Sequence, residues 1–391
     1  MRRESRYEYA RAIAARYRRA GRREKGRILD EFCAATGYHR KYALGLLRTP
    51  PVPVGPAPGR RVRAREYGPA EVGLLRACRE VADGICSKRL APFLPELLAT
   101  LAACGALPAD VGPEVVARVA RMSPASIDRA LRGGREAWPR RGRGTTKPGT
   151  LLKGQVPIKT FADWDGAVPG FLEIDLVAHC GASGAGEFLL SLSTVDVATG
   201  WSACAGVQNK GEYAVFRALE RLRDELPFPL LGIDSDNGSE FLNHSLVRWC
   251  AAEGITFTRS RPYRKEDTCH VEQKNWSVVR RLVGYGRFEG HALPQLNRVH
   301  ALARDYVNFL QPVLKLVQKT RDGAKVRKRY DTARTPYRRL LEAGVLCHEA
   351  RARLAEHHAA LHPVRLKLDL EEAQRALYAK AVRSDPYMRQ R

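Results

Sequence analysis

The feature that most constrains this chain is a set of three acidic residues carried by three different predicted elements. Residues 171–177 form an apolar, strand-like segment that contains Asp175, and residues 230–236 form a second one that ends at Asp236 beside an Asn-Gly turn. Residues 268–280 are predicted to be helical, with Glu272 in the first turn. The acids are separated by 236 − 175 = 61 and 272 − 236 = 36 positions.

Two strand-borne aspartates and a helix-borne glutamate can converge on a pair of Mg²⁺ ions. This cation prefers carboxylate oxygens and shares its remaining positions with water and substrate phosphate. Two such ions about 3.5–4 Å apart hold the attacking and leaving oxygens of an in-line phosphoryl displacement. The pattern therefore indicates the centre of a nuclease or a strand transferase.

These motifs resemble those of the DDE transposases and retroviral-type integrases, and the flanking regions are similar to bacterial insertion-sequence transposases. The resemblance rests on Asp175, on the Asp-Asn-Gly-Ser-Glu-Phe run that begins at Asp236, and on Glu272 within His-Val-Glu-Gln-Lys-Asn-Trp. It covers roughly residues 160–310 and implies an α/β RNase H-like catalytic core, a mixed five-stranded sheet with helices on both faces. It also implies that these three acids are catalytic and bind Mg²⁺, for which Mn²⁺ would substitute.

Neighbouring acids leave an alternative open at each strand. Asp234 lies two positions before Asp236 and could exchange roles with it, and Glu173 shares a strand face with Asp175. The preference for Asp175 and Asp236 rests on the resemblance. The sequence also departs from the family at Glu266 and Thr268, where relatives often carry Asn.

The catalytic segment also contains the other elements that such a core needs. Residues 187–194 and 201–207 are predicted to be antiparallel strands, and residues 255–258 a short final strand. One helix is expected to end at Pro227, and further helices are expected over residues 239–252 and 290–310.

The sequence suggests six segments in chain order. A helix-turn-helix domain (1–49) and a Pro/Arg-rich linker (50–68) precede a second helical, DNA-binding domain (69–133) and another linker (134–160). The integrase-type core (161–310) is followed by a small basic, largely helical C-terminal region (311–391). Within that last region, residues 319–330 fit a small β-hairpin or a loop, and residues 336–382 are mainly helical.

Candidate DNA contacts fall in both helical domains and beside the predicted catalytic centre. Three helices are predicted within residues 5–48, with Gly37 as a cap in the turn before the third. In the second domain, Ser123 and Pro124 are expected to begin a short helix. The candidates for DNA binding are His39, Arg40 and Lys41, then Ser126 and Arg129, and finally Arg259, Arg261, Tyr263, Arg264, Lys265 and Lys274. Ordinary basic helical bundles and a solvated loop are the alternative interpretations.

Charge and composition indicate which kind of partner the protein binds and in which compartment it is found. The net charge is +25 and the pI about 10.0, which favours a polyanionic partner, although GC-rich codon usage also enriches Arg. The first residues form no apolar signal segment, and no run of 18 apolar residues follows, so export and membrane insertion are not expected. Nine scattered cysteines without a Cys-x-x-Cys pair fit reduced thiols in a cytoplasmic protein, and the resemblance implies a bacterial, nucleoid-associated one. His179-Cys180 and Cys269-His270 contain zinc-binding residue types, but their spacing does not require a zinc site.

The sequence therefore predicts a transposase or integrase that cuts insertion-sequence ends and joins the 3′-hydroxyl to target DNA. Its partners would be double-stranded DNA, as transposon ends and as target, and further copies of itself, an expectation that comes from the resemblance. Two alternatives remain: a non-catalytic DNA-binding regulator derived from a transposase, and an RNase H-like nuclease that cuts without joining.

Overall fold

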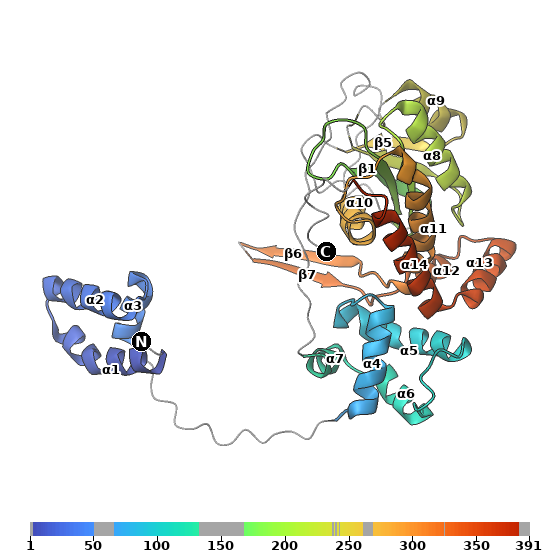
Figure 1. The fold of residues 1–391 in the computed structure, drawn as a ribbon. Coiled ribbons are helices and arrows are strands. Elements are labelled where there is room, and N and C mark those ends of the chain that lie inside the picture. The colour runs from blue at the N-terminus through green and yellow to red at the C-terminus, as the bar shows by residue number, and fades with distance from the viewer. Residues whose placement is uncertain are drawn as a thin grey trace. The chain divides into compact units, whose positions relative to one another are not determined.

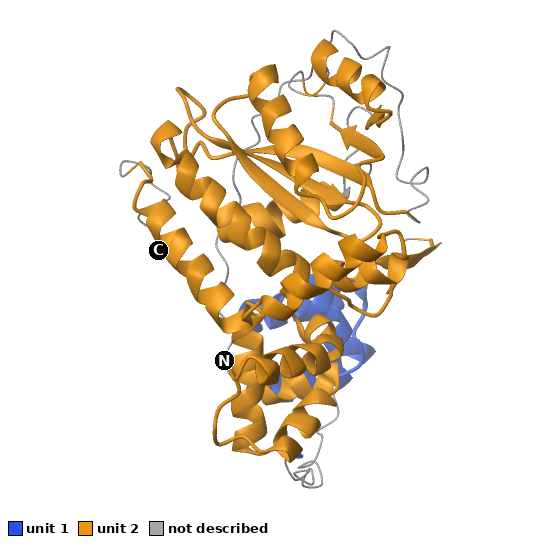
Figure 2. Cartoon of the chain, turned by 90° about the vertical axis from the view of Figure 1, so that its right-hand side faces the viewer, with its two compact units in different colours: residues 1–66 blue, residues 67–391 orange. Residues whose placement is uncertain are grey.

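The computed structural model describes residues 3–50, 66–132 and 168–382, apart from residues 237, 239, 240, 242, 261–268 and 324. Contacts group the chain into two compact units, Met1–Glu66 and Tyr67–Arg391 (Figure 2). Each unit has its own hydrophobic core, and we describe them separately.

The first unit consists of three helices, as the sequence predicts: α1 (Arg3–Arg19), α2 (Arg22–Thr36) and α3 (Arg40–Arg48) (Figure 1). Its core contains Ile28, Phe32 and Leu47, which are at most 1% exposed. Gly37 ends α2 with a φ of 70°, a left-handed conformation that a residue without Cβ adopts without strain.

The second unit begins with four helices, α4 (Pro69–Val81), α5 (Ser87–Ala103), α6 (Pro113–Ala120) and α7 (Pro124–Ala130). Ser123 caps α7 as predicted, because its side chain accepts a hydrogen bond from the Ser126 N–H at 3.2 Å. Helix α5 contains Pro92 and Pro95 within its length.

The catalytic segment forms a mixed five-stranded sheet with strand order β3-β2-β1-β4-β5. Its strands are β1 (Phe171–Ala178), β2 (Leu190–Asp196), β3 (Ser202–Val207), β4 (Gly232–Ser235) and β5 (Thr256–Arg259). β2 pairs antiparallel with both β1 and β3, whereas β4 pairs parallel with both β1 and β5. The predicted RNase H-like α/β architecture is therefore confirmed.

The parallel pairs require crossovers, which helices supply. Helix α8 (Glu212–Asp224) connects β3 to β4, and α9 (His244–Ala252) connects β4 to β5. The α9 helix begins at His244 and not at residue 239, because the Asn243 side chain accepts from the Leu246 N–H and caps it there.

Helices on the two faces of β1 bury both of its sides. Leu172 and Ile174 point to one face and Glu173 to the other, and all three are at most 1% exposed. Helix α10 (Cys269–Lys274) covers the Glu173 face and continues into a π-helical segment, Asn275–Arg280. Further along the chain, a short 3₁₀ turn (Gly290–Ala292) leads into α11 (Leu293–Leu310), which packs against β3.

The C-terminal region is a hairpin followed by helices. Of the two structures expected for residues 319–330, the hairpin is the one observed: β6 (Leu316–Asp322) pairs antiparallel with β7 (Lys325–Tyr330). Three helices follow, α12 (Pro336–Ala343), α13 (His348–Ala360) and α14 (Pro363–Tyr378).

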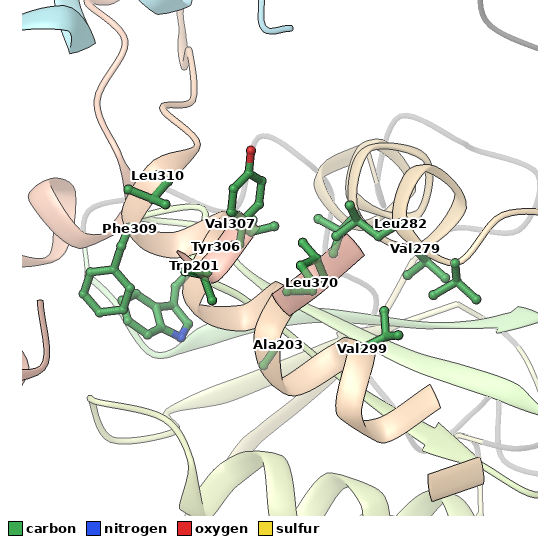
Figure 3. Close-up of a cluster of buried hydrophobic side chains, with 14 of the residues drawn as sticks. Trp201, Ala203, Val279, Leu282, Val299, Tyr306, Val307, Phe309, Leu310 and Leu370 are labelled. Carbon is green, nitrogen blue, oxygen red and sulfur yellow. The ribbon is translucent and has the colours of Figure 1, made fainter. Parts of the chain in front are cut away.

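Helix α14 is part of the catalytic core's packing. Leu370 of α14 lies near Val299 and Tyr306 of α11 in one buried cluster (Figure 3). Gln374 and Tyr378 also donate hydrogen bonds to the carbonyls of Leu282 and Val283, both at 2.7 Å.

The cysteines and the helix lengths bear on two expectations from the sequence. The eight cysteines described here are all free thiols. Among the described helices, none combines the length and apolar character needed to cross a bilayer.

Candidate active site

The register of two parallel strands brings the predicted aspartates to the same end of the sheet. β1 and β4 pair with Glu173 beside Asp234 and Ile174 beside Ser235. One step further along, Asp175 lies on β1 next to the point where β4 ends and Asp236 follows. Both aspartates are half-buried, so their carboxylates sit at the edge of the core and not inside it.

Asp175 is held from two sides. Its Oδ2 accepts a hydrogen bond from the Asn275 Nδ2 at 2.6 Å, and its Oδ1 accepts from the Leu176 N–H at 2.8 Å. Asn275 is the first residue of the π-helical segment after α10. The helix that carries Glu272 is thereby connected directly to the carboxylate of β1.

The three predicted acids act on one another electrostatically. Burial raises the pKa of Asp175 to about 7, the negative charges of Asp236 and Glu272 add to the rise, and the two hydrogen bonds oppose it. Like charges held close together disfavour ionisation. A divalent cation at this point would reverse that effect and favour the carboxylates.

Glu173 anchors the helix that carries Glu272. It is only 1% exposed, and its Oε2 accepts a hydrogen bond from the Val271 N–H at 2.9 Å in the first turn of α10. Burial raises its pKa to about 8, with a further contribution from the charge of Asp234. The raised pKa favours the neutral carboxyl, and the hydrogen bond fixes α10 to β1 while Glu272 remains exposed at the surface.

The two acids that were alternatives at the end of β4, Asp234 and Asp236, differ in their accessibility. Asp234 is fully buried, and its Oδ1 accepts a hydrogen bond from the Thr258 Oγ1 at 2.6 Å. Asp236 lies beyond the strand end, where its Oδ1 accepts from the Gly238 N–H at 2.9 Å. Accessibility therefore favours Asp175 and Asp236 over Glu173 and Asp234 as groups that could reach an ion or a substrate.

The chemistry of the donor set fits Mg²⁺, because carboxylate oxygens are the ligands that it prefers. Over residues 3–50, 66–132 and the described parts of 168–382, however, no three His, Cys, Asp or Glu side chains are grouped tightly enough to hold one ion together. Asp175 and Asp236 are adjacent through the sheet, whereas Glu272 is exposed on α10. A shared ion therefore requires Glu272 to turn toward the two aspartates.

A buried network that the sequence did not predict lies near this end of the sheet. Ser191 on β2 shares its hydroxyl between the Nε2 atoms of His179 and His300, each at 2.7 Å. Burial lowers the pKa of His300 to about 3 and that of His179 well below its usual value, so both rings are neutral. His179 is thus tied to the core. The side chain of Cys269, the other cysteine considered for zinc, lies outside the described residues.

The residues predicted to contact DNA differ in how exposed they are to solvent. His39, Arg40 and Lys41 are exposed at the start of α3, where the His39 ring accepts from the Lys41 N–H at 3.3 Å and Arg40 pairs with Asp30. Arg129 is exposed on α7 and donates to the Ser126 Oγ at 3.0 Å.

Three further candidates are buried in this structure: Ser126, Arg259 and Lys274 are each 8% exposed, and their contact with DNA stays a prediction. Ser126 belongs to the cap of α7, and Arg259 is the last residue of β5. Burial and the positive charge of Arg89 lower the pKa of Lys274 to about 7. The other four candidates, Arg261, Tyr263, Arg264 and Lys265, lie outside the described residues.

Comparison by sequence finds a family model and a relative that match this chain. The family model of the integrase core domain matches residues 167–265, a range that includes Asp175 and Asp236 and stops before Glu272. The uncharacterized protein y4rM of Sinorhizobium fredii is 44% identical over 334 residues, which span 83% of this chain and 92% of that protein.

Two solved structures are similar to parts of the chain. The catalytic core domain of BIV integrase is 20% identical, with a TM-score of 0.31, and the match covers 45% of this chain and 95% of that one. The HTLV-2 integrase catalytic core domain, in complex with magnesium and in dimeric form, is 18% identical, with a TM-score of 0.29, and the match covers 38% and 92%. Neither likeness is close enough to bear on the chemistry of this site.

Proposed function

Because this chain belongs to the integrase and transposase family with an RNase H-like core, we propose that it is a DNA transposase. It would cut the ends of an insertion sequence and join the freed 3′-hydroxyl to target DNA at one centre. The observation that carries this proposal is the parallel register of β1 and β4, which sets Asp175 beside Asp236, with the Glu272 helix hydrogen-bonded to the same strand.

Asp175, Asp236 and Glu272 are the residues that we assign to metal binding. Asp175 and Asp236 would hold one Mg²⁺ jointly, and Glu272 with one of the aspartates would hold the other, with Mn²⁺ as a substitute. The ions, when bound, would supply charge neutralisation at the attacking and leaving oxygens.

The remaining contributions come from the chain itself. The amide of Asn275 orients the Asp175 carboxylate, and the protonated Glu173 keeps α10 against β1. Phosphoryl transfer of this kind asks the protein mainly for positioning and electrostatic stabilisation. The hydrogen-bonded link between β1 and α10 supports such a positioning role.

The partners that we propose are double-stranded DNA and further copies of the same chain. The net charge of +25 supports a polyanionic partner. Two ends must be cut and joined in concert, so the active form would be a homo-oligomer assembled on DNA. A bacterial cytoplasmic protein associated with the nucleoid would meet both substrates.

Replacing Asp236 with Ala tests the assignment. Metal ions contribute several kcal/mol to the stabilisation of the transition state, and a loss of about 4 kcal/mol corresponds to about 10³-fold in rate. The wild type and D236A are incubated with Mg²⁺ or Mn²⁺ and a plasmid carrying the DNA that flanks the gene. Cut and joined products are then resolved on a gel, and duplex binding is measured separately.

We expect D236A to lose cutting and joining by about 10³-fold or more and to retain duplex binding. Activity of D236A equal to that of the wild type would refute the assignment. If the wild type yields cuts without joined products, the protein is a nuclease. If it binds DNA but produces neither, it is a regulator.

A further inference from the structure

The described side chains of the β6–β7 ribbon are all exposed. Every residue of β6 is exposed, and so are residues 326–330 of β7. This includes Val317 and Tyr330, which are 57% and 47% exposed. An isolated two-stranded ribbon is marginally stable in water unless one of its faces packs against something else. A partner outside the described chain is the simplest occupant of such a surface.

The charge of the ribbon specifies the kind of partner. Residues 316–330 contain six basic residues and one acidic residue, a formal charge of +5. Lys319 and Lys328 stand directly opposite each other in the register. Like charges in that position destabilise a strand pair, so a polyanion that neutralises them would stabilise the ribbon.

The strand register divides the ribbon into two different faces. On one face Gln318 lies opposite Arg329, Thr320 opposite Arg327 and, at the tip, Asp322 opposite Lys325; we call the first four of these residues the polar face. The other face carries the pair Lys319 and Lys328, the pair Arg321 and Val326, and Tyr330. Donors and acceptors suited to base edges are concentrated on the polar face, whereas the opposite face is partly apolar.

The base of the ribbon is fixed to the catalytic sheet. Lys315 precedes β6 and Asp331 follows β7. The Lys315 carbonyl accepts a hydrogen bond from the Asp331 N–H at 2.9 Å, and the Lys315 N–H donates to the Asp331 Oδ1 at 2.8 Å. The Lys315 ammonium donates to the carbonyls of Val197 and Ala198 in the β2–β3 turn. Arg339 of α12 pairs with Asp331 at 2.7 Å. The ribbon therefore leaves the catalytic sheet in a defined direction (Figure 1).

We propose that the β6–β7 ribbon is a DNA-binding arm that enters the major groove of a duplex with its polar face toward the base edges. The major groove is about 12 Å wide and admits a two-stranded β-ribbon. At about 3.4 Å per residue, a strand of this length is roughly 20 Å long and spans the groove. Arg and Gln are the side chains that pair with guanine and adenine there. The inference rests on the proposed function, which supplies duplex DNA as the substrate.

Disulfide crosslinking distinguishes the two faces of the ribbon. Thr320 and Lys319 are neighbours that point to opposite faces, so T320C and K319C form a matched pair. Each variant is mixed, in the presence of a chelator, with a duplex that carries a thiol tether on N4 of a cytosine in the major groove. The wild type measures the background from the exposed Cys86 and Cys347.

We expect T320C to crosslink several-fold more than K319C and the wild type. Equal yields from the two variants, or a greater yield from K319C, would overturn the proposed orientation. A yield at the wild-type background for both variants would overturn the groove contact itself.

Charge removal tests whether the ribbon contributes to affinity. R327A/R329A removes two positive charges from the polar face, and R351A/R353A removes two from the exposed surface of α13. Duplex affinity is measured for the full chain by fluorescence anisotropy in chelator at several salt concentrations. We expect the ribbon variant to bind about tenfold more weakly or worse, with a shallower salt dependence, and the α13 variant to bind like the wild type.

The outcomes separate this inference from the proposed function. Wild-type affinity and salt dependence in R327A/R329A would overturn the inference even if cutting and joining proceed. If that variant instead loses self-association in sedimentation, the ribbon binds a second copy of the chain and the inference is again wrong. Ribbon-dependent DNA binding in a protein that never cuts or joins would support the inference and remove the proposed function.

Discussion

Replacing Glu173 with Gln tests whether this buried carboxyl is neutral in the folded protein. Glu173 is 1% exposed and accepts a hydrogen bond from the Val271 N–H at 2.9 Å. The amide oxygen of Gln can accept the same bond in nearly the same shape. The substitution therefore removes the titration of the side chain and keeps its link to α10.

The expected change in the free energy of unfolding follows from the shift in the pKa of Glu173. Burial raises the pKa of Glu173 from 4.5 to about 8, and each unit is equivalent to about 1.36 kcal/mol. Between these two pKa values the unfolded chain releases the proton while the folded protein keeps it. The contribution of Glu173 to stability is therefore complete below about pH 4.5 and is lost as the pH rises to about 8.

Glu173→Gln has no such pH dependence. Its stability relative to the wild type should therefore increase by about 2–3 kcal/mol between about pH 5 and pH 7 and level off above about pH 8. Urea unfolding of the metal-free proteins at a series of pH values, followed by fluorescence and circular dichroism, measures this difference.

Glu356→Gln, on the exposed surface of α13, is the control that should behave like the wild type at every pH. Glu173→Ala removes the acceptor for the Val271 N–H and should be less stable than Glu173→Gln throughout. A difference between Glu173→Gln and the wild type that does not change with pH, or that falls as pH rises, would refute the assignment of a neutral carboxyl.

Two further substitutions test neighbouring residues. Asn275→Ala removes the 2.6 Å hydrogen bond to Asp175. Because a hydrogen bond to a charged group contributes about 1.5–3 kcal/mol, the rate of joining should fall about 10–100-fold, and a metal titration should show a higher Mg²⁺ requirement. An unchanged rate would contradict the orienting role of Asn275. Lys274→Met removes an ammonium whose pKa is lowered from 10.5 to about 7 by burial. The stability of the wild type should rise with pH between these two values, so the variant should gain more thermal stability at about pH 6 than at about pH 9. Its DNA affinity should be unchanged, and weaker DNA binding would support Lys274 as a contact.

The sheet was predictable because its strands carry strong local signals. Apolar segments bounded by turn residues gave all five strands and their order along the chain, with ends that shift by at most three residues. The start of β2 shows why the ends were less accurate. The Leu189 N–H donates its hydrogen bond to the carbonyl of Phe288, about a hundred residues away, so no local pattern separates Leu189 from the strand that begins at Leu190.

The predicted acids follow from the strand pattern more directly than the predicted DNA contacts do. Asp175 and Asp236 lie together because parallel strands carry them, and their order follows from the motif. Lys274, one of the predicted DNA contacts, lies two positions after Glu272 on the same helix. Two positions correspond to about 200° around an α-helix, so an exposed Glu272 turns Lys274 toward the sheet. Helical spacing alone therefore predicts the burial of Lys274.

The polar groups inside the core could not be inferred from local sequence. Ser191, His179 and His300 come from three separate elements, and only the folded chain shows that one hydroxyl serves two rings. Glu173 and Asp234 likewise read as possible catalytic acids until their burial is known.

The packing of α14 on α11 limits how this protein can be divided. Leu370 and Leu377 are completely buried, and the Tyr306 hydroxyl reaches back to the carbonyl of Val81 in α4. A fragment cut at the borders of the integrase-like segment, near residues 161 and 310, would leave apolar surface of α11 open to water on two sides. The fold of the integrase-like segment therefore depends on sequence that lies on both of its flanks, and a truncated protein would misfold before any activity could be assayed.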